Sequence, residues 1–169
     1  MKILYAASEA VPFCKTGGLA DVAGSLPAAL AAQGADVAVV LPLYQKVKEK
    51  FSDQLHFECY DYVDLAWRHS YCGLFSLEKD GVTWYFLDNE QYFNRPELYG
   101  YMDDGERFGF FSRAVVRMLP HLRFWPEVIH CNDWQTALVP IYLKDDSVRE
   151  ERFRSIRTVL SIHNIEYQG

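Results

Sequence analysis

The sequence has no hydrophobic run long enough to cross a membrane and no excess of basic residues. Its longest apolar stretches, such as residues 37–44, fall far below the roughly 18 residues that a membrane-spanning helix requires. The 17 Lys and Arg residues are outnumbered by 23 Asp and Glu residues, which gives a net charge of -6. Nonspecific binding to nucleic acid needs basic side chains. The composition therefore argues against a membrane role and against a nucleic-acid role.

The sequence also lacks closely spaced cysteines. Its four cysteines are far apart and form no Cys-x-x-Cys pair: Cys14, Cys59, Cys72 and Cys131. This spacing indicates neither a disulfide framework nor a zinc site, and it is typical of a protein in a reducing cytoplasm. We expect these residues to be small buried side chains rather than nucleophiles. Glu9 interrupts the first apolar stretch too early for a signal peptide, so we expect a strand there.

Hydrophobic residues make up 50% of the 169 residues, and aromatic residues make up 15%. A disordered chain lacks the apolar surface that such a composition provides. The length corresponds to about one domain, which is enough to bury a sizeable core.

The order of apolar patterns predicts an α/β fold. Continuous apolar runs predict buried strands, and apolar residues at helical spacing predict helices. The expected strands lie within residues 2–10, 36–44, 126–132 and 157–164, and the expected helices within residues 19–34, 106–122 and 133–145. Gly34 is expected to end the first helix and Pro27 to kink it. This alternation is typical of a Rossmann-like, mostly parallel sheet with helices on both faces.

The middle of the sequence departs from this alternation. Residues 54–88 show partial alternation and a turn signal at Asp80-Gly81, which predicts a small antiparallel hairpin insert. Residues 90–105 are expected to form an ordered loop, and Asp103 or Asp104 to cap the following helix. The charged residues 145–157 are expected to form a solvated helix end and loop.

The last expected strand is followed by no helix that could cover it. Strands of a parallel sheet need helices on both faces. We therefore expect residues 1–169 to be a fragment, cut inside or at the edge of a larger α/β domain.

The strongest local motif is Lys15-Thr16-Gly17-Gly18, between the first strand and the first helix. Adjacent glycines allow the backbone to bend tightly and to approach a ligand closely. The following helix start provides free N–H groups and a positive dipole end, to which Lys15 adds a full charge. The pattern therefore suits an anion such as phosphate, although a Gly-Gly pair can equally serve as a tight turn.

Two further polar clusters follow later strands. Asp133 comes at the carboxyl end of one expected strand, and His163 at the carboxyl end of the last. Taken alone, Asp133 is readily explained as a helix N-cap and His163 as a structural histidine. In open α/β sheets, however, ligands bind beyond the carboxyl ends of the strands. The convergence of Lys15, Asp133 and His163 on one sheet edge therefore predicts a binding site.

These motifs resemble the bacterial glycogen synthases and plant starch synthases. The resemblance is carried by residues 1–30, by residues 95–101 and 128–140, and by the terminal residues 161–169, and it extends over essentially the whole chain. The sequence departs from the family at Cys131, where Ala is common, and at Gln135, where many relatives have His.

The resemblance implies one half of a GT-B glycosyltransferase, in which two Rossmann-like halves face each other across a cleft. Such enzymes transfer glucose from ADP-glucose to the non-reducing end of an α-1,4-glucan, with retention and without a metal or other cofactor. The C-terminal, nucleotide-binding domain would be missing here. The resemblance therefore implies that this chain alone is inactive.

The resemblance also implies roles for individual residues. The donor would be bound by residues of the first loop and helix: Lys15, Thr16, Gly17, Gly18 and Asp21. Asp133 and Tyr99 would lie on the acceptor side, with Asp133 and His163 as the catalytic pair. His163 would act by hydrogen bonding and positioning. Tyr99 could instead simply pack, and Asp21 could instead be a first-turn acid that favours the helix dipole.

Two other functions remain open from sequence. One is a UDP-glucose-dependent glycosyltransferase of similar fold, because the donor is selected largely in the missing half. The other is a non-catalytic module that binds carbohydrate or nucleotide through the same loop.

Overall fold

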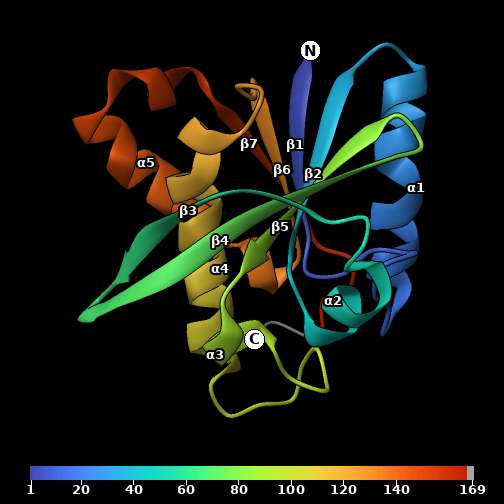
Figure 1. The fold of residues 1–169 in the computed structure, drawn as a ribbon. Helices are drawn as coiled ribbons and strands as arrows, with labels where there is room; N and C mark the ends of the chain where they lie inside the picture. The colour runs from blue at the N-terminus through green and yellow to red at the C-terminus, as the bar shows by residue number, and fades with distance from the viewer. Residues whose placement is uncertain (167–169) are drawn as a thin grey trace.

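The computed structural model describes residues 1–166, so the last three residues of the terminal motif lie outside the described part. Within that part, seven strands form one sheet in the order β3-β4-β5-β2-β1-β6-β7 (Figure 1). The strands are β1 (Lys2–Ala6), β2 (Asp36–Pro42), β3 (His56–Leu65), β4 (Arg68–Lys79), β5 (Val82–Asp88), β6 (Val128–Asn132) and β7 (Arg157–Ser161). The helices are α1 (Gly18–Ala32), α2 (Gln45–Phe51), α3 (Glu90–Phe93), α4 (Asp104–Met118) and α5 (Val139–Arg149). Short 3-10 turns are η1 (Leu119–His121), η2 (Trp134–Thr136) and η3 (Glu151–Ser155).

Strand β1 lies inside the sheet and pairs in parallel with β2 on one side and β6 on the other. Leu4 lies opposite both Ala38 and Ile129, and all three side chains are buried. Strand β7 continues the parallel sheet beyond β6, and β5 continues it beyond β2. The prediction of a mostly parallel sheet is confirmed, and β1 and β2 are buried as their apolar runs predicted. The expectation of a buried strand was wrong for β7, which is exposed along most of its length.

The expected hairpin region consists of β3, β4 and β5, which pair antiparallel. Asp80 and Gly81 have positive φ angles of 54° and 75°, as a tight two-residue hairpin turn requires. Because β5 also pairs in parallel with β2, this hairpin extends the main sheet and is not a separate layer.

Helices cover both faces of the sheet: Figure 1 shows α1 on one side, and α4 and α5 on the other. The predicted apolar stripe of α4 is buried, with Phe108 and Val115 among its members. α1 continues through Pro27 without interruption and ends at Ala32, just before Gly34, where φ is +87°. The amide of Gly34 donates to the carbonyl of Ala31 (2.9 Å), so the predicted helix end is confirmed.

Three local expectations were wrong or incomplete. Asp103 occupies the N-cap position of α4 without capping it, because its carboxylate pairs with Arg95 at 2.6 Å. Asp104 is already helical and accepts a hydrogen bond from the amide of Gly100 (2.7 Å). Residues 45–51 form α2, which the sequence pattern did not reveal.

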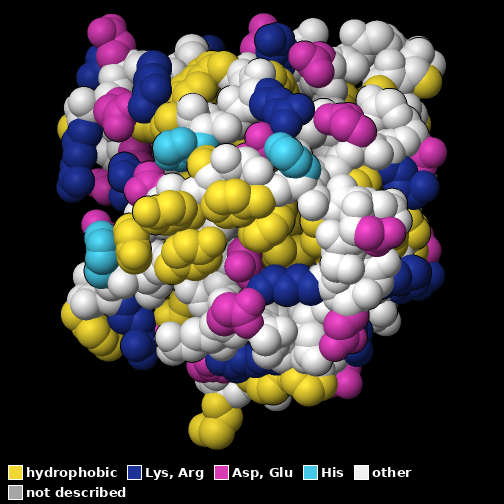
Figure 2. Space-filling model, viewed as in Figure 1, with side chains coloured by type: hydrophobic (Ala, Val, Ile, Leu, Met, Phe, Trp, Pro, Cys, Tyr) yellow, Lys and Arg dark blue, Asp and Glu magenta, His cyan; other side chains and the backbone are white. Residues whose placement is uncertain are grey.

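One sheet face carries exposed aromatic side chains. Figure 2 shows hydrophobic side chains gathered over β3 and β4, where Phe57, Tyr60, Tyr62 and Tyr71 are exposed. Tyr60 stacks on Tyr71 with ring centroids 5.7 Å apart. Tyr71 reaches across Gly73, where a Cβ atom would lie 2.7 Å from its hydroxyl oxygen. Gly73 therefore makes room for this arrangement.

Over residues 1–166, no helix combines the length and the apolar character needed to cross a membrane.

The close approach of Gly24 in α1 to the preceding loop yields a stability prediction. A Cβ atom on Gly24 would lie 2.6 Å from the backbone oxygen of Val11. Although alanine normally favours a helix over glycine, we expect Gly24→Ala to lower the free energy of unfolding by about 1–3 kcal/mol through overpacking. The measurement is urea unfolding followed by circular dichroism.

The matched control is Gly105→Ala in α4, where an added Cβ would meet no atom within 4 Å. This variant should be as stable as the parent chain or gain up to about 1 kcal/mol. If both substitutions changed the free energy of unfolding equally, the contact with Val11 would not limit the space at Gly24.

Candidate active site

A cleft of about 1070 Å³ lies at the carboxyl ends of β1, β6 and β7. Its lining comes from four segments that are distant in sequence: the loop after β1 with the start of α1, the start of α4 with the loop before it, the turn after β6, and the segment after β7. The lining residues are Glu9, Thr16, Gly17, Gly18, Leu19, Val22, Tyr99, Gly100, Asp104, Gly105, Asp133, Trp134, Gln135, His163, Asn164 and Glu166.

The sheet topology explains this location. After β1 the chain crosses to β2 on one side, whereas after β6 it crosses to β7 on the other side. The crevice between β1 and β6 is therefore a topological switch point, where open α/β sheets bind ligands. Of the three residues predicted to converge at this edge, Asp133 and His163 line the cleft, whereas Lys15 does not. The first loop reaches the cleft through the next residues, Thr16, Gly17 and Gly18.

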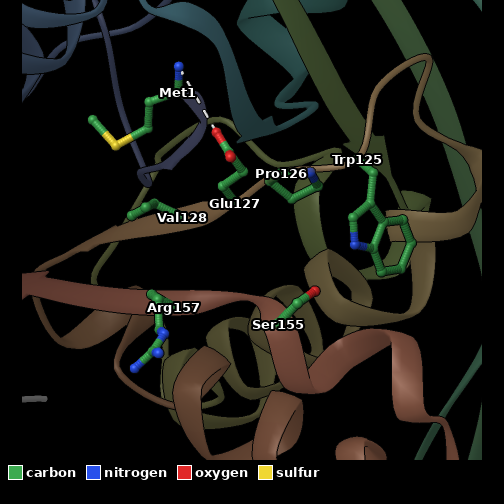
Figure 3. A pocket seen from close by; sticks show the side chains of 7 residues that line it. All are labelled: Met1, Trp125, Pro126, Glu127, Val128, Ser155 and Arg157. Atoms are coloured by element: carbon green, nitrogen blue, oxygen red, sulfur yellow. Dashed lines mark ion pairs between the residues drawn. The ribbon is translucent and has the colours of Figure 1, made fainter.

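A second hollow, of about 480 Å³, lies at the opposite edge of the sheet (Figure 3). It is lined by residues at the amino ends of β1, β6 and β7, including Met1, Glu127 and Arg157. The Glu127 carboxylate is already engaged by the Met1 amino group (3.8 Å) and by the backbone amide of Lys2 (2.6 Å). The acidic side chain of this lining is therefore already paired with groups at the start of the chain.

Glu9 anchors the loop at the floor of the cleft. This residue is 3% exposed, and its Oε2 atom accepts hydrogen bonds from both the backbone amide and the hydroxyl of Thr16 (2.9 Å for the hydroxyl). A buried carboxylate is costly unless such donors satisfy it. We predicted no role for Glu9 from the sequence, although a charged residue at the end of an expected buried strand indicates one.

Gly17 and Gly18 leave open space beside Glu9. The chain bends at Thr16 and Gly17, directly before α1, although neither glycine has a positive φ angle. A Cβ on Gly18 would meet no atom within 4 Å, and a Cβ on Gly17 would lie 3.7 Å from Glu9 Oε1. Gly17 is the N-cap of α1 and provides no side-chain cap. The glycines thus let a ligand approach the backbone at the helix start.

Lys15 and Asp21 do not line the cleft. The Lys15 ammonium lies 2.7 Å from both carboxylate oxygens of Asp21, and both side chains are about half exposed. The positive charge beside the helix start is therefore balanced by Asp21 in this structure. The two residues lie next to the cleft, and they interact with each other rather than with its interior.

Asp133 connects the turn after β6 to the end of β7. Its φ and ψ angles are 58° and -176°, a conformation that costs energy for any residue other than glycine. Its carboxylate accepts a hydrogen bond from the backbone amide of His163 (2.6 Å) and does not cap the following turn. The N-cap alternative for Asp133 is therefore wrong. The strained backbone brings Asp133 and His163 together at the cleft.

Tyr99 lies in the cleft wall formed by the loop before α4. Its hydroxyl is 2.7 Å from that of Ser8, and its ring packs on Phe108 with centroids 5.6 Å apart. Burial raises the pKa of Tyr99 well above its usual value, so its hydroxyl keeps its proton at neutral pH. The residue packs against the core and lines the cleft at the same time.

Arg107, in α4, holds the loop that carries Tyr99. This fully buried side chain donates to the backbone carbonyls of Tyr92 (2.7 Å) and Leu98 (3.0 Å) and pairs with Asp104. Sequence reasoning did not find it, because an arginine within an amphipathic helix is normally solvated.

The cysteines behave as small core residues. Cys14, Cys72 and Cys131 are buried and Cys59 is half-buried, all as free thiols. Burial raises the pKa of Cys14 to about 12, so the thiol near the cleft is not an activated nucleophile. Among residues 1–166, no three His, Cys, Asp or Glu side chains gather as a metal site would require.

The lining is rich in hydrogen-bond acceptors. It includes four carboxylates, from Glu9, Asp104, Asp133 and Glu166, and no Lys or Arg side chain from the described residues. Carboxylates accept hydrogen bonds from hydroxyl groups and repel anions. The cleft interior therefore suits a neutral, hydroxyl-rich ligand better than a phosphate.

Comparison with known proteins gives a consistent result. Residues 2–169 match the family model described as the starch synthase catalytic domain. The whole chain aligns with a glycogen synthase of Lactococcus lactis at 55% identity and with one of Clostridium botulinum at 51% identity. In both cases it spans only 36% of the relative's length.

Among solved structures, the catalytic domain of starch synthase IV from Arabidopsis thaliana, bound to ADP and acarbose, has a similar fold. The TM-score is 0.83 at 29% identity, over 98% of this chain and 34% of that chain. The predicted fold class is confirmed by this similarity and by the sheet described above.

The Glu9–Thr16 contact predicts how the loop responds to substitution. In Glu9→Ala the Thr16 amide and hydroxyl lose their acceptor, so we expect the free energy of unfolding to fall by about 1–3 kcal/mol. Hydrogen exchange at the Thr16 amide should accelerate at the same time. Urea unfolding and amide exchange measure the two effects. Glu9→Gln, which keeps one acceptor oxygen, should lose less, and unchanged exchange at Thr16 in Glu9→Ala would contradict the anchoring role.

Proposed function

Because the chain belongs to the starch synthase catalytic domain family, we propose that it forms one side of a glycosyltransferase active site. The proposed reaction is transfer of glucose from ADP-glucose to the non-reducing end of an α-1,4-glucan, with retention. The single observation that carries the proposal is the acceptor-rich cleft at the switch point, built from the same segments that the family resemblance singles out.

The sugars would occupy the interior of the cleft. Carboxylate oxygens of Glu9 and Asp133 would accept hydrogen bonds from sugar hydroxyls. The Tyr99 ring would supply an apolar surface for a sugar face, and His163 would contact the transferred glucose. Support comes from the lining itself, which offers many acceptors and an aromatic wall.

The donor diphosphate would lie at the outer edge, against the start of α1. The backbone at Gly17 and Gly18 is accessible there, and a helix N-terminus attracts anions. Lys15 is close in sequence and half exposed, so its ammonium could turn from Asp21 toward a phosphate. In this arrangement the ion pair with Asp21 would keep Lys15 near the donor site until a donor binds.

The chemistry would rest on geometry and charge. The bond between glucose C1 and the diphosphate oxygen breaks, a bond between C1 and the acceptor oxygen forms, and the acceptor proton passes to the departing phosphate. Holding both sugars in one cleft supplies orientation, and positive charge at the outer edge stabilises the leaving group. In this mechanism the cleft residues bind and orient the two sugars and stabilise the charge on the leaving group.

The relatives are longer, and this chain spans 36% of their length. We therefore propose that a second, C-terminal domain supplies the nucleotide pocket and further cations, and that residues 1–169 alone transfer no glucose. The test compares the isolated chain with the full-length protein, using ADP-glucose and UDP-glucose side by side with glycogen as acceptor. Transfer by the isolated chain would contradict the two-domain proposal. A preference for UDP-glucose, or no transfer by either protein, would contradict the proposed reaction.

Lys15→Ala separates a role in donor binding from a structural role. In the full-length protein we expect glucose transfer to fall by about 100-fold or more, which is the typical loss for a group that stabilises transition-state charge. The melting temperature should hardly change, since an exposed ion pair contributes at most about 1 kcal/mol.

The matched control is Lys46→Ala. Lys46 is as exposed as Lys15 and pairs with Glu97 at 3.3 Å, outside the cleft. It should leave both activity and melting temperature nearly unchanged. If Lys15→Ala lowered the melting temperature and the activity in parallel, the result would contradict a role of Lys15 in donor binding.

A further inference from the structure

The Asn132 side chain forms four hydrogen bonds at the carboxyl end of β6. The residue is fully buried. Its Nδ2 atom donates to the backbone carbonyls of Ala6 (3.0 Å) and His130 (3.1 Å). Carbonyl oxygens only accept hydrogen bonds, so these two partners determine which end of the amide is the NH₂ group. Rotation of the amide by 180° would place oxygen against oxygen.

The oxygen of the same amide is directed at two other groups. Asn132 Oδ1 lies 2.9 Å from the hydroxyl of Tyr5 and 2.9 Å from Nε2 of His163. Burial raises the pKa of Tyr5 to about 12, so this hydroxyl keeps its proton at neutral pH and donates it. An amide oxygen carries no hydrogen, and therefore the hydrogen in the contact with His163 must be on Nε2.

A neutral imidazole carries one N–H group, so protonation of Nε2 leaves Nδ1 as a bare acceptor. Within residues 1–166, Nδ1 of His163 has no hydrogen-bond partner, and the residue lines the cleft. The backbone amide of His163 is held by Asp133 (2.6 Å). The residue is thus fixed at its backbone and at one ring nitrogen, and its other ring nitrogen remains available.

We infer that Asn132 is a positioning residue that keeps His163 in the Nε2–H tautomer. His163 then accepts a hydrogen bond from a hydroxyl group in the cleft and does not donate one. The backbone carbonyls of Ala6 and His130 keep the amide in this orientation, and Tyr5 donates a second hydrogen bond to Oδ1. The hydrogen on Nε2 follows from the contacts themselves, whereas the identity of the hydroxyl as one on the transferred glucose rests on the proposed function.

The first test measures the tautomer directly in the full-length protein labelled with ¹⁵N-histidine. Long-range ¹H–¹⁵N spectra distinguish the two tautomers, and the His163 signal is identified by its loss in His163→Gln. We expect the Nε2–H form in the unsubstituted protein and a mixture of forms in Asn132→Ala. An Nδ1–H form in the unsubstituted protein would overturn the inference. So would an unchanged His163 signal in a folded Asn132→Ala protein.

Two further variants keep the inference testable if Asn132→Ala does not fold. Asn132→Asp retains an acceptor oxygen toward His163, so the Nε2–H form should be retained even if stability falls. Ser161→Ala is the matched control, since the Ser161 hydroxyl contacts His130 Nε2 (2.7 Å) and not His163. It should change the His130 signal and leave the His163 tautomer intact. If Asn132→Asp loses the Nε2–H form while folded, or if Ser161→Ala alters the His163 tautomer, the assignment to Asn132 is wrong.

The second test asks whether His163 or the ligand hydroxyl donates the hydrogen bond between them. Binding to the full-length protein is measured for ADP-glucose and for analogues in which one glucose hydroxyl is replaced by hydrogen or by fluorine. Fluorine cannot donate a hydrogen bond. At one ring position we therefore expect both analogues to bind about tenfold more weakly, and the loss to disappear in His163→Ala.

A fluorinated analogue that binds as well as ADP-glucose where the deoxy analogue does not would show that His163 donates. The absence of any position that depends on His163 would equally overturn the hydrogen bond to the ligand. Failure of the proposed function is distinguishable from both results. In that case ADP-glucose itself does not bind, while the spectra still report the Nε2–H tautomer.

Discussion

The parallel pairing of β1 with β2 and β6 is the constraint on which the site depends. Because β1 is buried between two parallel neighbours, its carboxyl end and that of β6 must open at the same sheet edge. The loop at Thr16 and the turn at Asp133 are therefore brought together by main-chain hydrogen bonds rather than by contacts of their own. A register change of one residue would reverse the faces of these strands and separate the two segments.

Three buried polar side chains then give the cleft its shape. Glu9 fixes the loop before α1, Arg107 fixes the loop before α4, and Asn132 fixes His163. Each is buried. Glu9 binds Thr16 within its own loop, whereas Arg107 and Asn132 bind groups from other elements. Such groups are costly to bury without partners, so they favour one arrangement of the loops over others. The lining residues are consequently held in place before a ligand arrives.

The sequence predicted the parts of the structure that depend on local periodicity. The buried runs of β1 and β2, the stripe of α4 and the helix end at Gly34 follow from residue spacing. Position along the strands also predicted that the segments after β1, β6 and β7 would meet. The interactions within the site were not predictable, because the contact of Asn132 with Tyr5 spans 127 residues. Likewise, nothing in a local pattern shows that Lys15 pairs with Asp21.

The loop between β1 and α1 looks from its glycines like a flexible segment, yet it is fastened to the molecule along its length. The amide of Val11 donates to the carbonyl of Ala20 in α1 (3.0 Å), and the Phe13 ring packs against Phe51 and Trp84. The loop is therefore attached to α1 through Val11 and to α2 and β5 through Phe13. The backbone that borders the cleft at Thr16 is consequently held by three elements of the domain at once, so its position does not depend on the conformational freedom of Gly17 and Gly18.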